Sequence, residues 1–174
     1  MKKFLVAVDL QKDFVDGALG TKEAVGIIPA AAAKIRNFEG GIFVTFDTHG
    51  ENYLNTAEGR KLPVVHCVKG SGGWQLDEEI SKALEGRNFT AVEKPTFGST
   101  ALPALIEEAA QGDDFSVELI GLCTDICVVS NALLIKANFP EMQISVDSAC
   151  CAGVTPEKHN AALETMRSCQ IDII

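Results

Sequence analysis

Short runs of β-branched and other apolar residues alternate with alanine-rich stretches along the whole 174-residue chain. Such alternation is typical of βαβ units, in which a helix follows each strand and returns the chain to the same edge of the sheet. Most of the runs are continuously apolar, as expected for strands that are covered on both faces, so the sheet should be mostly parallel. The pattern predicts a three-layer α/β/α fold of Rossmann-like architecture.

The alternation yields six strands and five helices. We expect strands at residues 4–8, 42–46, 89–92, 116–121, 143–146 and 170–174, and helices at residues 23–37, 75–84, 101–110, 125–137 and 156–167. No Pro-, Gly- or Ser-rich linker divides the pattern, so residues 1–174 are expected to form a single domain. Residues 48–74 alone lack a helical or strand period, and a long irregular segment inside a compact domain usually serves function.

Composition narrows the classes of partner. With 24 acidic and 15 basic residues, the formal charge is −9, which opposes binding to nucleic acid or to an anionic membrane surface. No apolar run reaches the roughly 20 residues that span a bilayer, and the start of the chain does not match a signal peptide, so a cytoplasmic protein is expected. The six cysteines form no paired C-x-x-C motif, and we expect reduced thiols rather than disulfides or a zinc knuckle.

Several chemically capable residues follow expected strands. In an open α/β sheet the ligand lies outside the carboxyl ends of the strands, and Asp9, Asp47, Lys94 and Cys127 all fall there. Cys127 lies where a strand turns into a helix. With Thr124 as the N-cap, Cys127 would be the third helical residue, where free N–H groups and the helix dipole favour a thiolate and can hold an oxyanion. The alternative is that Cys127 is a small buried apolar residue, as most free cysteines are.

The other two residues have both a functional and an ordinary interpretation. A carboxylate such as Asp9, placed after four apolar residues, could serve as a general base toward a thiol, or it could form an Asx turn. Lys94 could stabilise the carboxylate and thiolate, or it could be a solvated surface charge.

A second group of residues could bind a metal ion. Asp47 and His49, followed by Glu58 and His66, offer oxygen and nitrogen ligands that suit zinc, iron or manganese. Ordinary turn chemistry at the end of a strand is the alternative. The third histidine, His159, falls in the last expected helix and is expected to be exposed.

Three sequence blocks carry a resemblance to a known family. They are residues 8–14 (VDLQKDF), 93–97 (EKPTF) and 121–128 (GLCTDICV). Together they resemble the isochorismatase-like cysteine hydrolases, and among them the nicotinamidases, over nearly the whole chain. The resemblance implies a catalytic triad of Asp9, Lys94 and Cys127, an oxyanion hole built from the backbone N–H groups of Cys123 and Cys127, and a non-proline cis peptide between Leu122 and Cys123. Cys123 departs from the pattern, because relatives typically carry alanine there.

The same resemblance assigns the metal and substrate residues. It implies a divalent ion held by Asp47, His49 and His66, with Glu58 as a further ligand; zinc is the first choice, and iron or manganese are alternatives. In such enzymes the ion holds the pyridine nitrogen of the substrate, and the proteins are often dimers or tetramers. No organic cofactor is implied.

The expected substrate site differs from the nicotinamidase pattern in one respect. Relatives carry an aromatic residue before the Pro-x-His segment, where this chain has residues 61–64 (KLPV). Phe14, Phe97 and Leu122 are expected to contact substrate instead, although core packing is the alternative for either phenylalanine. Trp74 could line the entrance.

These observations predict a metal-dependent cysteine amidohydrolase that converts nicotinamide to nicotinic acid and ammonia through a thioester on Cys127. One alternative keeps the fold but acts on another small amide, carbamate or ureido compound. A flavodoxin-like binding module without catalysis is the alternative from a different class, but no G-x-G-x-x-G phosphate loop follows the first strand.

Overall fold

A computed structural model describes all of residues 1–174 and contains one six-stranded sheet. The strands are β1 (Lys2–Val8), β2 (Gly41–Asp47), β3 (Thr90–Lys94), β4 (Phe115–Leu122), β5 (Gln143–Ala152) and β6 (Asp172–Ile173). Their spatial order is β3-β2-β1-β4-β5-β6, and every neighbouring pair is parallel. The expected α/β fold is therefore confirmed. Because all the strands are parallel, their carboxyl ends lie along one edge of the sheet.

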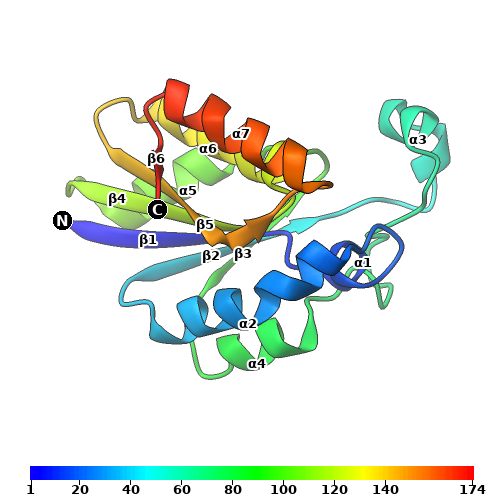
Figure 1. Cartoon of the computed structure of the whole chain (residues 1–174). Helices are drawn as coiled ribbons and strands as arrows, with labels where there is room; N and C mark the ends of the chain where they lie inside the picture. Colours follow the sequence, from blue (N-terminus) through cyan, green and yellow to red (C-terminus); the bar gives the residue numbers. More distant parts are fainter.

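Helices cover both faces of the sheet (Figure 1). On one side lie α2 (Lys22–Asn37) and α4 (Glu78–Leu84), and on the other lie α5 (Leu102–Ala110), α6 (Val129–Asn138) and α7 (Pro156–Ser168). Successive residues of β1 point to opposite faces, so Leu5 and Ala7 pack in one buried cluster while Phe4 and Val6 pack in the other. The layers thus form two cores with the sheet between them.

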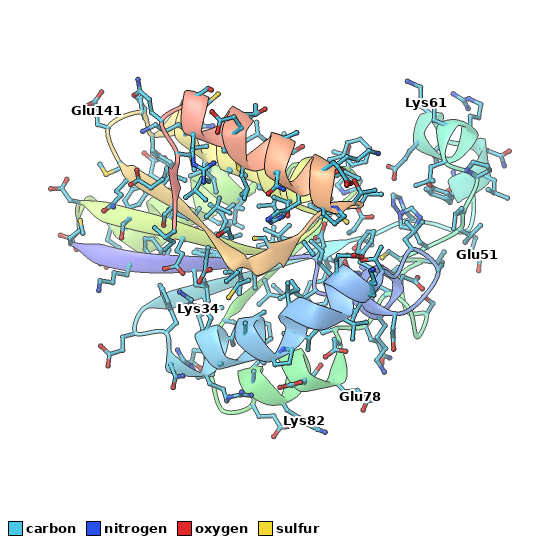
Figure 2. All side chains as sticks on the ribbon, viewed as in Figure 1. Lys34, Glu51, Lys61, Glu78, Lys82 and Glu141 are labelled. Carbon is cyan, nitrogen blue, oxygen red and sulfur yellow. The ribbon has the colours of Figure 1, made fainter.

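The sequence of α2 shows how one of these layers forms. Thr21 caps the helix by accepting a hydrogen bond from Ala24 N–H, and the buried residues Ala24, Ile28, Ala31, Ala32 and Ile35 repeat at helical spacing. At the partly buried end of this face, Lys34 pairs with Glu118 at 2.6 Å and Asp147 at 2.8 Å (Figure 2). This ion-pair cluster lines an open groove of about 880 Å³ that contains none of the expected catalytic or metal-binding residues.

Some expected boundaries were wrong. Strand β5 continues to Ala152, six residues beyond its expected end, whereas β6 holds only two residues. Helix α4 begins at Glu78 rather than at residue 75, because the Asp77 side chain caps the N–H groups of Glu79 and Ile80.

Residues 48–74 are less irregular than expected. They contain a 3₁₀ turn, η1 (Tyr53–Asn55), and a short helix, α3 (Ala57–Lys61). Both elements form although the segment has no apolar period. This excursion projects from the carboxyl-end side of the sheet, where it carries Glu51 and Lys61 outward (Figures 1 and 2). A further short helix, α1 (Lys12–Val15), follows β1.

The helices are too short or too polar to cross a bilayer. The longest, α2, has 16 residues, and none combines the length and hydropathy of a membrane span.

Candidate active site

Three side chains from separate strands converge at the carboxyl-end edge. Asp9 directly follows β1, Lys94 is the last residue of β3, and Cys127 lies in the turn after β4. Lys94 Nζ lies 2.6 Å from Asp9 Oδ2 and 3.5 Å from Cys127 Sγ. Their exposed fractions are 0% for Asp9, 1% for Lys94 and 4% for Cys127. The structure therefore brings together all three residues of the expected triad, and Lys94 is not a solvated surface charge.

The Asp9 carboxylate is held in place by Thr45. The Thr45 hydroxyl donates to Asp9 Oδ1 at 2.6 Å and accepts from Asp9 N–H at 3.2 Å. Asp9 has φ +47°, a left-handed conformation that is uncommon outside glycine and often found at functional sites. Burial raises the pKa of Asp9, and Lys94 opposes this rise. Oδ2 pairs ionically with Lys94 but receives no well-directed hydrogen bond, so it keeps a lone pair for another proton.

Lys94 remains a cation despite its burial. Desolvation alone would lower the pKa of its ammonium group, but Asp9, Cys127 and Asp47 together raise it above the ordinary value. The Nζ atom also donates to Thr96 O at 3.1 Å and lies 3.5 Å from Asp47 Oδ1. Lys94 thus connects the triad to the carboxylate of Asp47.

The surroundings of Cys127 oppose the thiolate that the helix start was expected to favour. Burial and the nearby Asp9 carboxylate raise the pKa of the thiol well above its usual value. The helix start is also different, because residues Thr124–Val128 form a π turn, η2, and Cys127 is its fourth residue rather than the third. The buried surroundings of Cys127 thus favour its thiol form, next to a carboxylate that can accept the proton.

Cys123 occupies the N-cap position that was expected for Thr124. Its side chain caps nothing, and its backbone N–H donates to no acceptor within the chain. The Leu122–Cys123 peptide is cis, as the resemblance implied. Just before it, Gly121 has φ +119°, and a Cβ there would lie 2.1 Å from Val8 O, so only glycine fits. Cys123 thus has a backbone N–H without an acceptor in the chain, and the residue lines the cavity described below.

A second cluster lies next to the triad. His49 Nε2 lies 2.9 Å and His66 Nε2 lies 3.5 Å from Asp47 Oδ2, and both nitrogens lie 3.8 Å from Glu58 Oε1. All four ligand atoms lie within 4.8 Å of one another. The four residues expected to bind a metal are therefore brought together, with Glu58 and His66 supplied by the excursion.

The chemistry of this donor set fits a divalent ion. His66 Nδ1 lies 2.8 Å from Val64 O, and donating its proton there leaves a free lone pair on Nε2, which faces the cluster. For tetrahedral zinc with nitrogen and oxygen ligands, the ligand atoms lie about 3.4 Å apart, close to the spacings found here. Two carboxylates and two imidazoles are also ligands that suit zinc, iron and manganese.

Several supporting residues were not anticipated from the sequence. Gln11 clamps the end of β2, because its side chain accepts from Asp47 N–H at 2.8 Å and donates to Asp47 O at 2.9 Å. Tyr53 is fully buried against the rings of His49 and His66, at centroid distances of 4.7 and 4.9 Å. Gln11 falls inside the first sequence block that carries the resemblance, residues 8–14, which is a signal that could have identified it, whereas Tyr53 follows no pattern.

Asn131 is a further unanticipated residue, on α6 one turn after the nucleophile. Its amide donates to Cys127 O at 2.8 Å, and its oxygen accepts from Ser99 N–H at 2.9 Å. It ties the turn to the segment after β3.

One cavity of about 280 Å³ is lined by Cys127 of the triad and by Asp47, Glu58 and His66 of the metal cluster. Its lining residues include Asp47, Glu58, His66, Cys123, Cys127, Phe14, Phe97, Leu122, Leu19, Leu62, Ile126, Val154 and Lys158. All three residues expected to contact substrate, Phe14, Phe97 and Leu122, therefore line it. Trp74 does not, because its indole packs on Phe46 and donates to Thr48.

His159 is also placed differently from the expectation. It is half-buried rather than exposed, and its Nδ1 lies 2.8 Å from Thr124 Oγ1. The Thr124 hydroxyl therefore serves this contact and not the helix cap.

Comparison with known proteins agrees with this geometry. The isochorismatase domain family matches residues 3–174. An uncharacterized isochorismatase family protein PncA of Bacillus subtilis is 30% identical over 94% of this chain and 93% of its own length. A pyrazinamidase/nicotinamidase structure from Streptococcus mutans superposes with a TM-score of 0.85 at 27% identity, covering 99% of each chain. A Pyrococcus horikoshii pyrazinamidase in complex with zinc gives a TM-score of 0.79 at 27% identity, covering 100% of this chain and 99% of the other. With its buried Asp9, Lys94 and Cys127 at the edge of a parallel sheet, the chain belongs to the isochorismatase family.

Proposed function

We propose that this protein is a metal-dependent cysteine amidohydrolase that converts nicotinamide to nicotinic acid and ammonia. Membership of the isochorismatase family and the nicotinamidase and pyrazinamidase relatives make it a hydrolase of amide carbon–nitrogen bonds. The observation that carries the finer proposal is one cavity lined both by Cys127, whose sulfur lies against the buried Lys94–Asp9 pair, and by Asp47, Glu58 and His66 of the metal cluster.

The triad supports acyl transfer through a thioester. Asp9 takes the proton of the Cys127 thiol through Oδ2, the oxygen that Thr45 does not bind, and the sulfur attacks the carboxamide carbon. The proton passes to the departing nitrogen, which leaves as ammonia while the acyl group remains on sulfur. Asp9 then deprotonates a water molecule that releases the acid and restores the thiol. Lys94 offsets the negative charge that accumulates during both steps.

Backbone donors stabilise the tetrahedral intermediates. The Cys123 N–H has no acceptor in the chain, and the Cys127 N–H lies in the same turn, so the pair forms the proposed oxyanion hole. The cis peptide preceding Cys123 is the same backbone feature that the resemblance implied at this position.

Asp47, His49, Glu58 and His66 would hold the metal ion, with zinc as the first choice. When bound, the ion supplies a Lewis-acid contact for the pyridine nitrogen and orients the ring so that the carboxamide faces Cys127. The zinc complex of the Pyrococcus horikoshii relative supports this choice. Phe14 and Phe97 line the cavity that Cys127 and the metal cluster share, and the ring of Phe14 lies 5.5 Å from that of His66.

A second candidate substrate class is another small amide, carbamate or ureido compound. The observation that favours it is Leu62, which lines the cavity where nicotinamidases that the sequence resembles carry an aromatic residue. A binding module without catalysis accounts poorly for three buried ionisable groups in contact with one another, of which Cys127 lines the cavity.

Purified protein, loaded with zinc and incubated with nicotinamide, should release ammonia in a coupled glutamate dehydrogenase assay. Cys127→Ala should abolish release, whereas Cys169→Ala, which removes an exposed thiol that does not line the cavity, should leave it unchanged. A panel of small amides and ureido compounds decides between the two substrate classes. Ammonia release by the Cys127→Ala variant at the wild-type rate would refute the mechanism.

Assembly and location remain predictions. A homodimer or homotetramer is expected and can be checked by light scattering of the purified chain. A cytoplasmic place and a role in pyridine nucleotide salvage can be checked by cell fractionation and by growth on nicotinamide.

A further inference from the structure

Two side-chain hydrogen bonds connect the nucleophile turn to the start of α7. Thr124 Oγ1 and His159 Nδ1 lie 2.8 Å apart, and Asp125 Oδ1 accepts Val154 N–H at 2.9 Å. The two bonds involve the first two residues of η2, three and two positions before Cys127. The turn therefore cannot shift relative to α7 without breaking at least one of them.

The packing between these segments leaves no room for adjustment. A Cβ on Gly153, at the end of β5, would lie 2.8 Å from His159 N and 2.9 Å from Asp125 Oδ1. The strand end, the helix start and the nucleophile turn are thus in direct contact. Gly153 and Val154, between β5 and α7, and Lys158 of α7 also line the cavity, so the segment that contacts the turn forms part of the cavity wall.

The contact between Thr124 and His159 is specific to this pair. Thr124 is fully buried, and His159 is the only partner that its hydroxyl has. Burial lowers the pKa of His159, and the Asp125 carboxylate only partly opposes this, so the ring is neutral near pH 7. In the tautomer that carries its proton on Nε2, Nδ1 accepts from the Thr124 hydroxyl.

We propose that His159 is a positioning residue for the nucleophile. By holding Thr124 it holds the whole η2 turn, so that the Cys127 sulfur and the Cys123 N–H face the same point in the cavity. This rests on the proposed hydrolase function. His159 does not line the cavity, so its loss acts on the reaction of bound substrate rather than on substrate affinity.

The test compares variants that remove or keep the acceptor. His159→Leu removes it at similar volume, His159→Asn retains an oxygen close to the Nδ1 position, Thr124→Val removes the donor, and Thr124→Ser retains it. Because small displacements of a reacting group strongly reduce rates, kcat for nicotinamide should fall about 10- to 100-fold in His159→Leu and Thr124→Val, with KM changed by less than about threefold. Both conservative variants should keep most of the wild-type kcat. The double variant His159→Leu/Thr124→Val should lose no more than either single one.

A second measurement reports the reactivity of the Cys127 thiol in the absence of substrate. The rate of iodoacetamide labelling at Cys127, followed by mass spectrometry of its peptide, should fall in His159→Leu and Thr124→Val and recover in His159→Asn. Unchanged kcat and labelling in folded His159→Leu would overturn the proposal, as would an equal loss in His159→Asn or multiplicative losses in the double variant. If wild-type protein releases no ammonia from nicotinamide, the proposed function fails, while the labelling rates still decide the positioning role. Should His159→Leu not fold, Thr124→Val and Thr124→Ser decide the same question.

Discussion

Thr45→Val isolates the hydrogen bond that holds the Asp9 carboxylate. Thr45 is fully buried, and valine keeps its branched shape in β2 while removing the hydroxyl that donates to Asp9 Oδ1 at 2.6 Å. A buried hydrogen bond to a charged group contributes about 1.5 to 3 kcal/mol. At 1.36 kcal/mol for each pKa unit, losing a bond that favours the carboxylate form should raise the pKa of Asp9 by about 1 to 2 units. Thr45 does lower this pKa in the native protein.

Two assays test this reasoning. In the pH profile of kcat/KM for nicotinamide, the acidic limb should move to higher pH by about 1 to 2 units, because the general base must be ionised. In urea unfolding at pH 7.5, the variant should be less stable by about 1.5 to 3 kcal/mol. In the folded state, Asp9 of the variant has a higher pKa than Asp9 of the wild type. The variant therefore loses stability relative to the wild type as the pH rises through that pKa. The difference between their free energies of unfolding should be smaller at pH 5 than at pH 7.5.

Thr45→Ser is the matched control, since it keeps the hydroxyl and loses only a methyl group. Its acidic limb should coincide with that of the wild type. An acidic limb that stays in place in Thr45→Val, although stability falls, would refute the assignment of Asp9 as the base. A limb that moves equally in Thr45→Ser would show that packing, and not the hydrogen bond, sets the pKa.

Three further outcomes are expected. Cys123→Ala should retain the wild-type kcat, because the proposed donor is the backbone N–H; a large loss measured in the ammonia assay would assign a role to the thiol. His66→Gln should lose the zinc that elemental analysis finds in the wild type, while Glu51→Gln, an exposed acid on the same excursion, should keep it; equal zinc content in both would remove the metal site. Leu62→Trp should lower KM for nicotinamide by about 2- to 10-fold through stacking on the ring, whereas Leu54→Trp, outside the cavity, should not; an unchanged KM in Leu62→Trp would favour the second substrate class.

The predicted fold rested on local sequence patterns, and the structure confirmed its α/β architecture. Continuous apolar runs predicted strands buried on both faces, and the rule that ligands lie at the carboxyl ends placed Asp9, Lys94 and Cys127 on one edge. Capping interactions were less predictable. Helix α4 is shorter than expected because Asp77 caps it, and the Thr124 hydroxyl contacts His159 instead of capping a helix. A short polar side chain forms a hydrogen bond with whichever group the tertiary structure brings near it.

The excursion illustrates what local pattern could not provide. Residues around Tyr53 and Glu58 show no apolar period, yet they fold into short helical turns that return Glu58 and His66 to Asp47. Short helices gain little from propensity alone and depend on packing, here of Tyr53 against two histidine rings.

The sequence by itself determined the βαβ order, the edge of the sheet where the site lies, and the identities of nucleophile, base, cation and metal-binding candidates. Only the tertiary structure decided their state. Burial and the Asp9 carboxylate raise the pKa of the Cys127 thiol, and Lys94 opposes this rise. A pKa depends on solvent exclusion and on charges summed through space, and residues 9, 94 and 127 become neighbours only when the sheet has formed.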